Sequence, residues 1–370
     1  MTLVWALLLA ALLQPAAPPA ARAPGPGYQQ LLAQATAARE ANDVSAAIPL
    51  YQKLVRLRPA VPENWWFLAT LLYDTDRYPE ARDAFRKLVA RVSDNGPAWA
   101  LLGLCEFQTK EYPAAGTHLE TGLRIGVDKQ PQLAEVAHYH YALLLTKIGE
   151  FERASAQLFE FARAGKDDPS MVMATGIAAL RKPLLPAEVP EADRELVLQT
   201  GRAVYDAAAR KAEVAQKEME ALVARYPAVP NIHYIYGSYL MFSDPDRGLK
   251  ELRRELEISP GHVPARVGIV VEYLKRGEPA AALPYARDAV ELAPKDFVTH
   301  TLYGRVLVES GDVKPGVTEL ELAAKLAPDS PQTRVALAAA YAKAGRKEDA
   351  ARERAVFLKL KSESKSPGEQ

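Results

Sequence analysis

Residues 62–129 read PENWWFLATLLYDTDRYPEARDAFRKLVARVSDN followed at once by GPAWALLGLCEFQTKEYPAAGTHLETGLRIGVDK. The second block of 34 residues aligns with the first without a gap. The matched pairs are Trp65 with Trp99, Leu68 with Leu102, Tyr78 with Tyr112, Pro79 with Pro113, and Ala81 with Ala115. A fixed period of this length indicates repeated structural units that stack on one another. This stretch therefore predicts the architecture of the chain.

The spacing within each block predicts a pair of helices. Counting from Pro62, positions 4, 7, 8 and 11 fall on one face of a first helix, because successive residues turn by about 100°. In the first block these are Trp65, Leu68, Ala69 and Leu72. A second helix returns the contact through Ala81, Phe85 and Leu88. Position 8 is small in both blocks (Ala69, then Gly103), so we expect the two helices to approach closely there.

This period and residue pattern resemble the tetratricopeptide repeat, a helix–turn–helix unit. The resemblance implies an all-α fold, a right-handed solenoid of antiparallel helical hairpins. It also implies that the chain binds other proteins. One hairpin cannot bury its apolar face alone, so neighbouring units must stack.

Further units are predicted on both sides of the central pair. They span residues 28–61 and 135–168, with one more first helix at 169–181, and then 230–262, 263–296, 297–330 and 331–364. Residues 182–190 contain three prolines and are predicted to be an exposed insertion loop. Residues 191–227 are predicted to form an irregular helical pair. We therefore expect an amino-terminal array (28–181), a carboxy-terminal array (191–364) and a disordered tail (365–370).

The amino terminus has a different composition. Leu3 to Leu13 is an apolar run of 11 residues, too short to cross a bilayer, and Met1 to Ala23 is predicted to be a secretory signal peptide. No Lys or Arg precedes the run, which leaves a misassigned start or a retained anchor as alternatives. We expect a periplasmic or secreted protein with no stable membrane span in the mature chain.

Composition and motifs argue against catalysis. Lys plus Arg and Asp plus Glu number 46 each, so no net field attracts nucleic acid. The single cysteine, Cys105, is predicted to be a small buried hydrophobe. His138 and His140 lie two residues apart on a predicted helix and point in nearly opposite directions, so they cannot share a metal. We predict no enzyme activity, no cofactor and no metal.

The family resemblance implies that positions 2, 5, 9, 12 and 13 of the first helices face a bound segment. In the unit at 62–95 these are Glu63, Trp66, Thr70, Tyr73 and Asp74. The candidate binding residues are Trp66, Thr70, Tyr73, Phe107, Tyr139 and Tyr234, with the amino-terminal half preferred. Trp65 should be buried and Trp66 should face the groove. The alternative is that neighbouring units bury these aromatic side chains.

We therefore predict a non-enzymatic scaffold or adaptor that holds an extended or helical protein segment in a groove. The alternative is a non-catalytic accessory subunit of a cell-envelope assembly or polysaccharide export machine. Family members that clamp a peptide carboxylate place Lys at position 5 and Asn at position 9. Trp66 and Thr70 do not match that pattern. The partner and the oligomeric state remain open.

Overall fold

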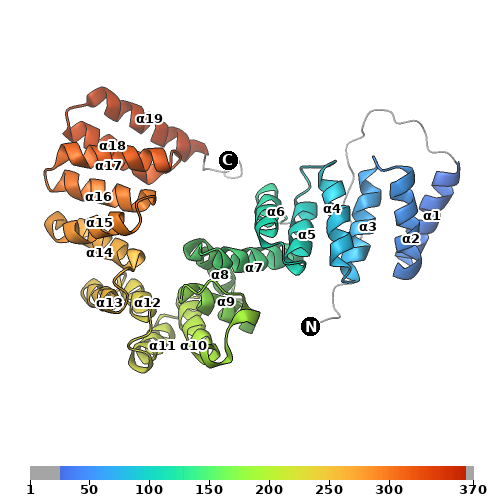
Figure 1. The fold of residues 1–370 in the computed structure, drawn as a ribbon, viewed down its shortest axis with the longest axis horizontal. Helices are drawn as coiled ribbons and strands as arrows, with labels where there is room; N and C mark the ends of the chain where they lie inside the picture. The colour runs from blue at the N-terminus through green and yellow to red at the C-terminus, as the bar shows by residue number, and fades with distance from the viewer. Residues whose placement is uncertain (1–25, 128, 364–370) are drawn as a thin grey trace. The chain divides into compact units, whose positions relative to one another are not determined.

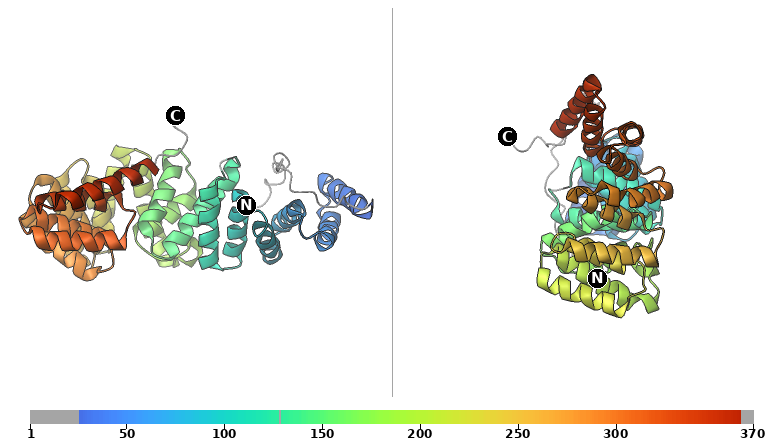
Figure 2. Two further views of the ribbon diagram at one scale, coloured as in Figure 1. Left: turned by 90° about the horizontal axis from the view of Figure 1, so that it is seen from above. Right: turned by 90° about the vertical axis from the view of Figure 1, so that its left-hand side faces the viewer.

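A computed structural model describes residues 26–127 and 129–363, and within these residues all regular structure is helical (Figure 1). Within residues 26–179 and 212–363, each helix contacts the helix that follows it in the chain, and most of them pair as antiparallel hairpins (Figure 2). The predicted all-α solenoid of helical hairpins is confirmed. The chain divides into two compact units, residues 1–194 and 195–370, which are described separately below as unit 1 and unit 2.

Unit 1 contains four hairpins and one further helix among its described residues. Its helices are α1 (Pro26–Glu40), α2 (Val44–Leu57), α3 (Pro62–Asp74), α4 (Tyr78–Val89), α5 (Gly96–Gln108), α6 (Tyr112–Ile125), α7 (Pro131–Lys147), α8 (Phe151–Arg163) and α9 (Pro169–Ala179), followed by the 3₁₀ turn η1 (Pro186–Glu188). The hairpins α1–α2, α3–α4, α5–α6 and α7–α8 coincide with the units predicted at 28–61, 62–95, 96–129 and 135–168.

Unit 2 follows the same plan. Its helices are α10 (Glu191–Ala208), in which the division between the units falls, α11 (Ala212–Arg225), α12 (Ile232–Leu240), α13 (Pro245–Ile258), α14 (Val263–Arg276), α15 (Pro279–Leu292), α16 (Phe297–Glu309), α17 (Val313–Leu326), α18 (Pro331–Lys343) and α19 (Lys347–Glu363). The hairpins from α12 to α19 coincide with the four units predicted from residue 230 onward.

The helix boundaries follow from local side-chain chemistry. Asn95 ends the preceding loop and its side chain accepts a hydrogen bond from the Ala98 amide at 2.9 Å, which satisfies one of the free N–H groups of α5. Most hairpin turns place one residue in the left-handed region, although residues 241–244 between α12 and α13 do not. Gly277 occupies it at φ 73° and Gly311 at φ 98°, whereas Lys110 occupies the corresponding turn at φ 63° with a side chain that disfavours it.

Small residues allow the two helices of a hairpin to meet. A Cβ atom placed on Gly103 would lie 2.7 Å from Leu119 Cγ and 2.9 Å from the Leu119 amide nitrogen. Gly304 of α16 meets Leu320 of α17 in the same way, at 2.7 Å. The small residue at position 8 is thus a packing requirement in both units.

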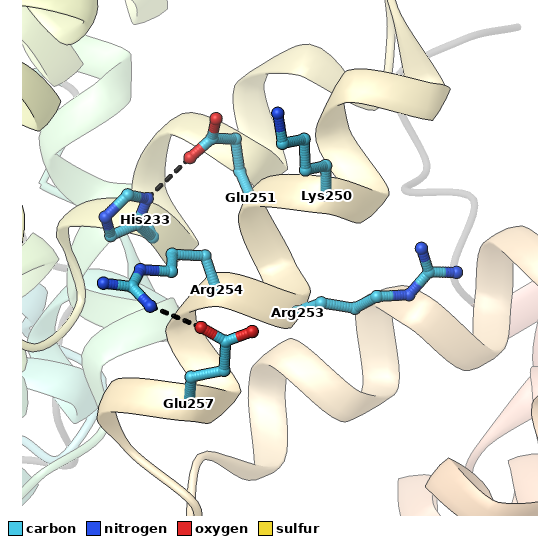
Figure 3. A pocket seen from close by; sticks show the side chains of 6 residues that line it. All are labelled: His233, Lys250, Glu251, Arg253, Arg254 and Glu257. Atoms are coloured by element: carbon cyan, nitrogen blue, oxygen red, sulfur yellow. Dashed lines mark hydrogen bonds and ion pairs between the residues drawn. The ribbon is translucent and has the colours of Figure 1, made fainter.

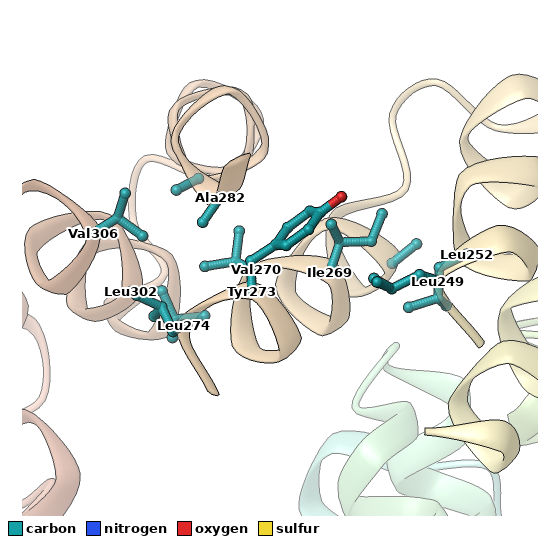
Figure 4. Close-up of a cluster of buried hydrophobic side chains, with 11 residues drawn as sticks. Leu249, Leu252, Ile269, Val270, Tyr273, Leu274, Ala282, Leu302 and Val306 are labelled. Carbon is teal, nitrogen blue, oxygen red and sulfur yellow. The ribbon is translucent and has the colours of Figure 1, made fainter. Parts of the chain in front are cut away.

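The core of unit 2 shows how neighbouring hairpins merge. Leu249 and Leu252 of α13 pack with Ile269, Val270 and Tyr273 of α14, and the same cluster continues to Val306 of α16 (Figure 4). Because one apolar cluster runs through three consecutive hairpins, no hairpin is buried by its own residues alone.

The connector 182–190 is more firmly anchored than its three prolines suggest. Leu185 and Val189 are buried, at 7% and 5% exposure. Glu188 forms an ion pair with Lys147 of α7 at 2.7 Å and also accepts a hydrogen bond from the Leu185 amide at 2.7 Å. The connector is thus partly exposed and partly anchored: Pro183, Ala187 and Pro190 are exposed, whereas Leu185 and Val189 are buried.

Both predicted termini, the signal peptide (1–23) and the tail (365–370), lie outside the described residues. Within the part of the chain that the structure describes, no helix is both long enough and apolar enough to cross a membrane.

Candidate functional site

The surface formed by the first helices of unit 1, namely α3, α5 and α7, carries most of the predicted binding residues. We call it the first-helix surface. Helices α5 and α7 contact each other directly, and α7 contacts α9. Its side chains were predicted to form one aromatic stripe, and the structure divides them into buried and accessible residues.

The two adjacent tryptophans are placed opposite to expectation. Trp66 is only 7% exposed, and its ring packs edge-on against Phe85 of α4 with the centroids 6.2 Å apart. Trp65 is partly exposed, and its indole N–H donates to the Pro59 carbonyl at 2.7 Å. Arg91 covers the Trp65 ring at 5.4 Å. The prediction that Trp66 faces a groove was wrong, because the side chain at position 5 of α3 packs against α4, the second helix of the same hairpin.

Thr70 is also buried rather than presented to a ligand. Its hydroxyl donates to the Trp66 carbonyl at 3.0 Å, one turn back on the same helix. With that hydrogen bond made and 9% of the side chain exposed, Thr70 offers no free polar group to a partner. Trp66 and Thr70 are therefore both buried, and the contacts described for them lie within their own repeat unit.

Three of the predicted residues in unit 1 remain partly exposed. Phe107 of α5 contacts His140 of α7 edge-on at 4.7 Å, and His140 contacts Tyr139 at 5.5 Å. Tyr73, at the end of α3, packs edge-on against Tyr78 at 5.6 Å and lies within electrostatic range of Cys105 on α5. We call Tyr73, Phe107, Tyr139 and His140 the aromatic strip. His140 was not predicted as part of it.

The polar atoms of the aromatic strip lie in crowded surroundings. Burial raises the pKa of the Tyr73 hydroxyl, and it raises the pKa of Tyr139 to about 12. Burial also lowers the pKa of His140, whose Nδ1 is 2.8 Å from the Val136 carbonyl. The strip therefore presents ring edges and neutral polar atoms at neutral pH.

Tyr234 belongs to unit 2, on α12. Its ring contacts His262 at 4.6 Å, and its backbone N–H points to Glu255 at 3.3 Å. Large apolar side chains stand exposed on the first helices of this unit or directly after them: Phe242 at 94%, Val271 at 48% and Val335 at 47%. Binding was expected to favour the amino-terminal half of the chain. These three side chains of unit 2 are nevertheless more exposed to solvent than Trp66 of unit 1, at 7%.

A depression of about 330 Å³ in unit 2 is lined by one residue of α12 and five residues of α13 (Figure 3). His233 and Glu251 pair there at 2.6 Å, and Arg254 pairs with Glu257. Lys250 and Arg253 line the edge and point away from these pairs (Figure 3). Both acidic side chains of the depression are therefore paired with basic side chains of the same unit.

Glu106 lies at position 11 of its unit, where an apolar residue is expected. It is fully buried, and Arg86 binds it at 2.7 Å while His118 Nδ1 lies 2.6 Å from its other oxygen. Beside it, burial raises the pKa of the Cys105 thiol to about 12. Cys105 is therefore protonated and unreactive, as a buried structural cysteine should be.

No group of three or more His, Cys, Asp or Glu side chains within the described ranges is arranged to hold a metal ion. His138 and His140 have separate partners. His138 Nδ1 lies 2.7 Å from Gln157 of α8, whereas His140 faces the Val136 carbonyl of its own helix. The two rings do not converge.

Comparison with known proteins places part of this arrangement in a family. Residues 32–97 and 77–127 match a family model described as tetratricopeptide repeat. No curated protein sequence matches the chain.

Solved structures of similar proteins include MamA (residues 41 to the end) from Desulfovibrio magneticus RS-1, at 19% identity and a TM-score of 0.42, covering 46% of this chain and 96% of that one. YrrB, described as a TPR protein with an unusual peptide-binding site, is 15% identical with a TM-score of 0.38 and covers 45% of this chain and 84% of its own. The Cut9–Hcn1 structure is 13% identical with a TM-score of 0.37, and the match covers 90% of this chain and 79% of that one.

Proposed function

Since the chain is a tetratricopeptide-repeat protein, with family repeats matched over residues 32–127, we propose that unit 1 is a protein-interaction scaffold that holds a partner segment on its first-helix surface. The main observation that supports this proposal is that the aromatic strip remains partly exposed although the helices around it are closely packed. Partly exposed aromatic rings on a rigid helical frame are typical anchors for a partner, because they bury large apolar area without losing much conformational freedom.

The strip crosses from one hairpin to the next. Phe107 on α5 and His140 on α7 are in ring contact, and the Tyr139 hydroxyl reaches toward the Ser170 carbonyl of α9 at 3.5 Å. A segment lying across these residues would therefore contact several first helices at once. An extended strand or an amphipathic helix could both do so.

Selection of peptides on the purified protein tests this proposal. A phage-displayed library of random dodecapeptides should yield peptides enriched in apolar residues. The Phe107→Ala and Tyr139→Ala variants should each bind the selected peptides about 10- to 30-fold more weakly, the loss expected for an anchor residue worth about 1.4–2 kcal/mol.

Phe242→Ala is the matched control. Phe242 is an exposed aromatic residue of unit 2, outside the strip, so its removal should leave binding to unit 1 unchanged. If Phe242→Ala abolishes binding while Phe107→Ala does not, the partner surface belongs to unit 2. Recovery of no enriched peptide would contradict the proposal for unit 1.

We also propose that Met1 to Ala23 direct export and that the scaffold acts in the periplasm or outside the cell. The apolar run from Leu3 to Leu13 supports this. The intact mass of protein recovered from its own cell envelope should be lower than that of the full chain by roughly the first 23 residues. A full-length mass in the cytosolic fraction would refute export. Stable co-purification with a membrane complex would favour the accessory-subunit alternative.

A further inference from the structure

Asp74 ends α3 directly after Tyr73 of the aromatic strip; the residue as a whole is exposed, although nearby protein atoms crowd its carboxyl group. Among the described residues, no Lys, Arg or His pairs with it and no N–H group donates to it. The two nearest charged side chains in sequence are occupied. Asp76 accepts the Tyr78 hydroxyl at 2.5 Å, and Arg77 pairs with Glu80 at 2.5 Å.

The position is an unfavourable one for a free carboxylate. The carboxyl end of a helix carries a partial negative charge, so an anion in the last turn is repelled by the backbone dipoles. Surrounding protein atoms also crowd Asp74, and this burial alone raises its pKa to about 6. At neutral pH the group is nonetheless charged. An unpaired carboxylate in the last turn of a helix lowers the stability of the folded chain. A role in binding a ligand therefore explains its presence better than a role in stabilising the fold.

The neighbours of Asp74 define what that ligand should be. Tyr73 offers a partly exposed aromatic ring that packs edge-on against Tyr78. Exactly one repeat later, Phe107 and the exposed Gln108 occupy the same two positions, so an aromatic residue followed by a polar one recurs along the surface. An aromatic ring next to a carboxylate suits a long cationic side chain, whose stem packs on the ring while its charged end reaches the acid.

We propose that Asp74 binds a Lys or Arg side chain of the partner segment, with the aliphatic stem of that side chain lying against Tyr73. The inference rests on the proposed function of the aromatic strip and names the chemistry of its ligand: an apolar segment that carries a positive charge. An acidic segment would be repelled. A charge-assisted hydrogen bond to the carboxylate supplies the specificity.

The same dodecapeptide selection tests this inference when it is run in parallel on three proteins. On the wild-type chain at pH 7.5, recovered peptides should be enriched in Lys and Arg as well as in apolar residues. On Asp74→Asn the apolar enrichment should persist and the Lys and Arg enrichment should vanish. Asp76→Asn is the control, because that carboxylate is already engaged by Tyr78 and Asn tolerates the left-handed conformation at φ 58°.

A thermodynamic cycle on one selected peptide gives the second readout. Replacing its Lys by norleucine keeps the stem and removes the charge. This change should weaken binding to the wild-type chain about five- to tenfold and leave binding to Asp74→Asn unchanged. The thermal midpoints of the variants, measured beside the wild type, show that each variant is folded.

The outcomes separate the two proposals. Apolar enrichment without Lys or Arg, or enrichment in Asp and Glu, would overturn the role of Asp74 and leave the aromatic strip standing as a binding surface. Equal losses in Asp74→Asn and Asp76→Asn would also overturn it, because a general negative field would then explain the preference. No enrichment on any of the three proteins would overturn both proposals.

Discussion

The Tyr341 hydroxyl donates to Glu321 at 2.8 Å, and Arg346 binds the same carboxylate oxygen at 3.1 Å while its guanidinium lies 4.1 Å above the Tyr341 ring. Glu321 belongs to the second helix of one hairpin, and Tyr341 to the first helix of the next. We call this three-residue contact the clasp, and it recurs in unit 2 at Glu220, Tyr236 and Arg247; in unit 1 the same residue types meet at Glu120, Tyr141 and Arg153, where Arg153 donates to the Tyr141 hydroxyl. Burial raises the pKa of each of these tyrosines to about 12, so all three remain protonated donors at neutral pH.

Removing the hydroxyl from a clasp should weaken the joint between two hairpins. We expect Tyr341→Phe to lower the free energy of unfolding by about 0.5–1.5 kcal/mol, since one hydrogen bond to a charged acceptor is lost while the ring and its contact with Arg346 remain. Urea denaturation followed by circular dichroism measures the change. Tyr303→Phe is the control, because the Tyr303 hydroxyl makes no hydrogen bond to another residue in 26–127 or 129–363 and its ring is also partly buried in unit 2. Equal losses in both variants would mean that the hydroxyl of the clasp contributes nothing.

A second prediction concerns the contact between the helices of one hairpin. Gly103→Ala should destabilise unit 1 by about 1–3 kcal/mol, because the added methyl group would meet the Leu119 side chain and backbone below 3 Å. Gly116→Ala lies in α6, where no atom stands within 4 Å of the new carbon. That variant should gain up to about 1 kcal/mol from higher helix propensity. A loss in Gly116→Ala equal to that in Gly103→Ala would refute the packing explanation.

The two adjacent tryptophans should differ in their effect on stability. Trp66→Ala removes a buried ring packed against Phe85 and should cost about 3–5 kcal/mol. Trp65→Ala loses one hydrogen bond to the Pro59 carbonyl and the contact with Arg91, which together should cost about 1–2 kcal/mol. Chemical denaturation followed by circular dichroism is suitable, since fluorescence changes with either substitution. A larger loss in Trp65→Ala would restore the arrangement predicted from the repeat register.

Asp74 should make unit 1 less stable as the pH rises. Its pKa is about 6 in the folded chain against 3.8 for a free carboxyl group. The folded state therefore binds the proton more tightly, and the free energy of unfolding falls as the pH rises from about 4 to about 6. Above about pH 6 the Asp74 carboxylate is charged, and its full destabilising effect on the folded state remains.

Replacing Asp74 by Asn removes this dependence. Asp74→Asn should be more stable than the wild type at pH 7.5, by about 1 kcal/mol or less because solvent at the exposed edge screens the charge. At pH 4 the two proteins should unfold at nearly the same temperature. A constant difference in thermal midpoint across this range would show that Asp74 does not titrate as the structure indicates.

The sequence alone determined the elements and their pairing. An ungapped period of 34 residues, the apolar face of each first helix and a small residue at position 8 predicted the hairpins at 28–61, 62–95, 96–129 and from 230 onward, because these signals act within one unit. Gly103 shows this clearly. Its contact with Leu119 could be predicted since both residues belong to the same repeat.

Only the tertiary structure decided which side chains of the first helices remain accessible. Position 5 was predicted to face a partner, yet Trp66 is buried against Phe85, while Tyr73 and Phe107 at position 12 keep exposed edges. The clasps and the buried Glu106 were likewise invisible in the repeat pattern. The physical reason is that helix periodicity fixes the direction of a side chain only relative to its own helix. Its burial depends on how closely the neighbouring helices approach, and its charge depends on partners such as Arg86, 20 residues away.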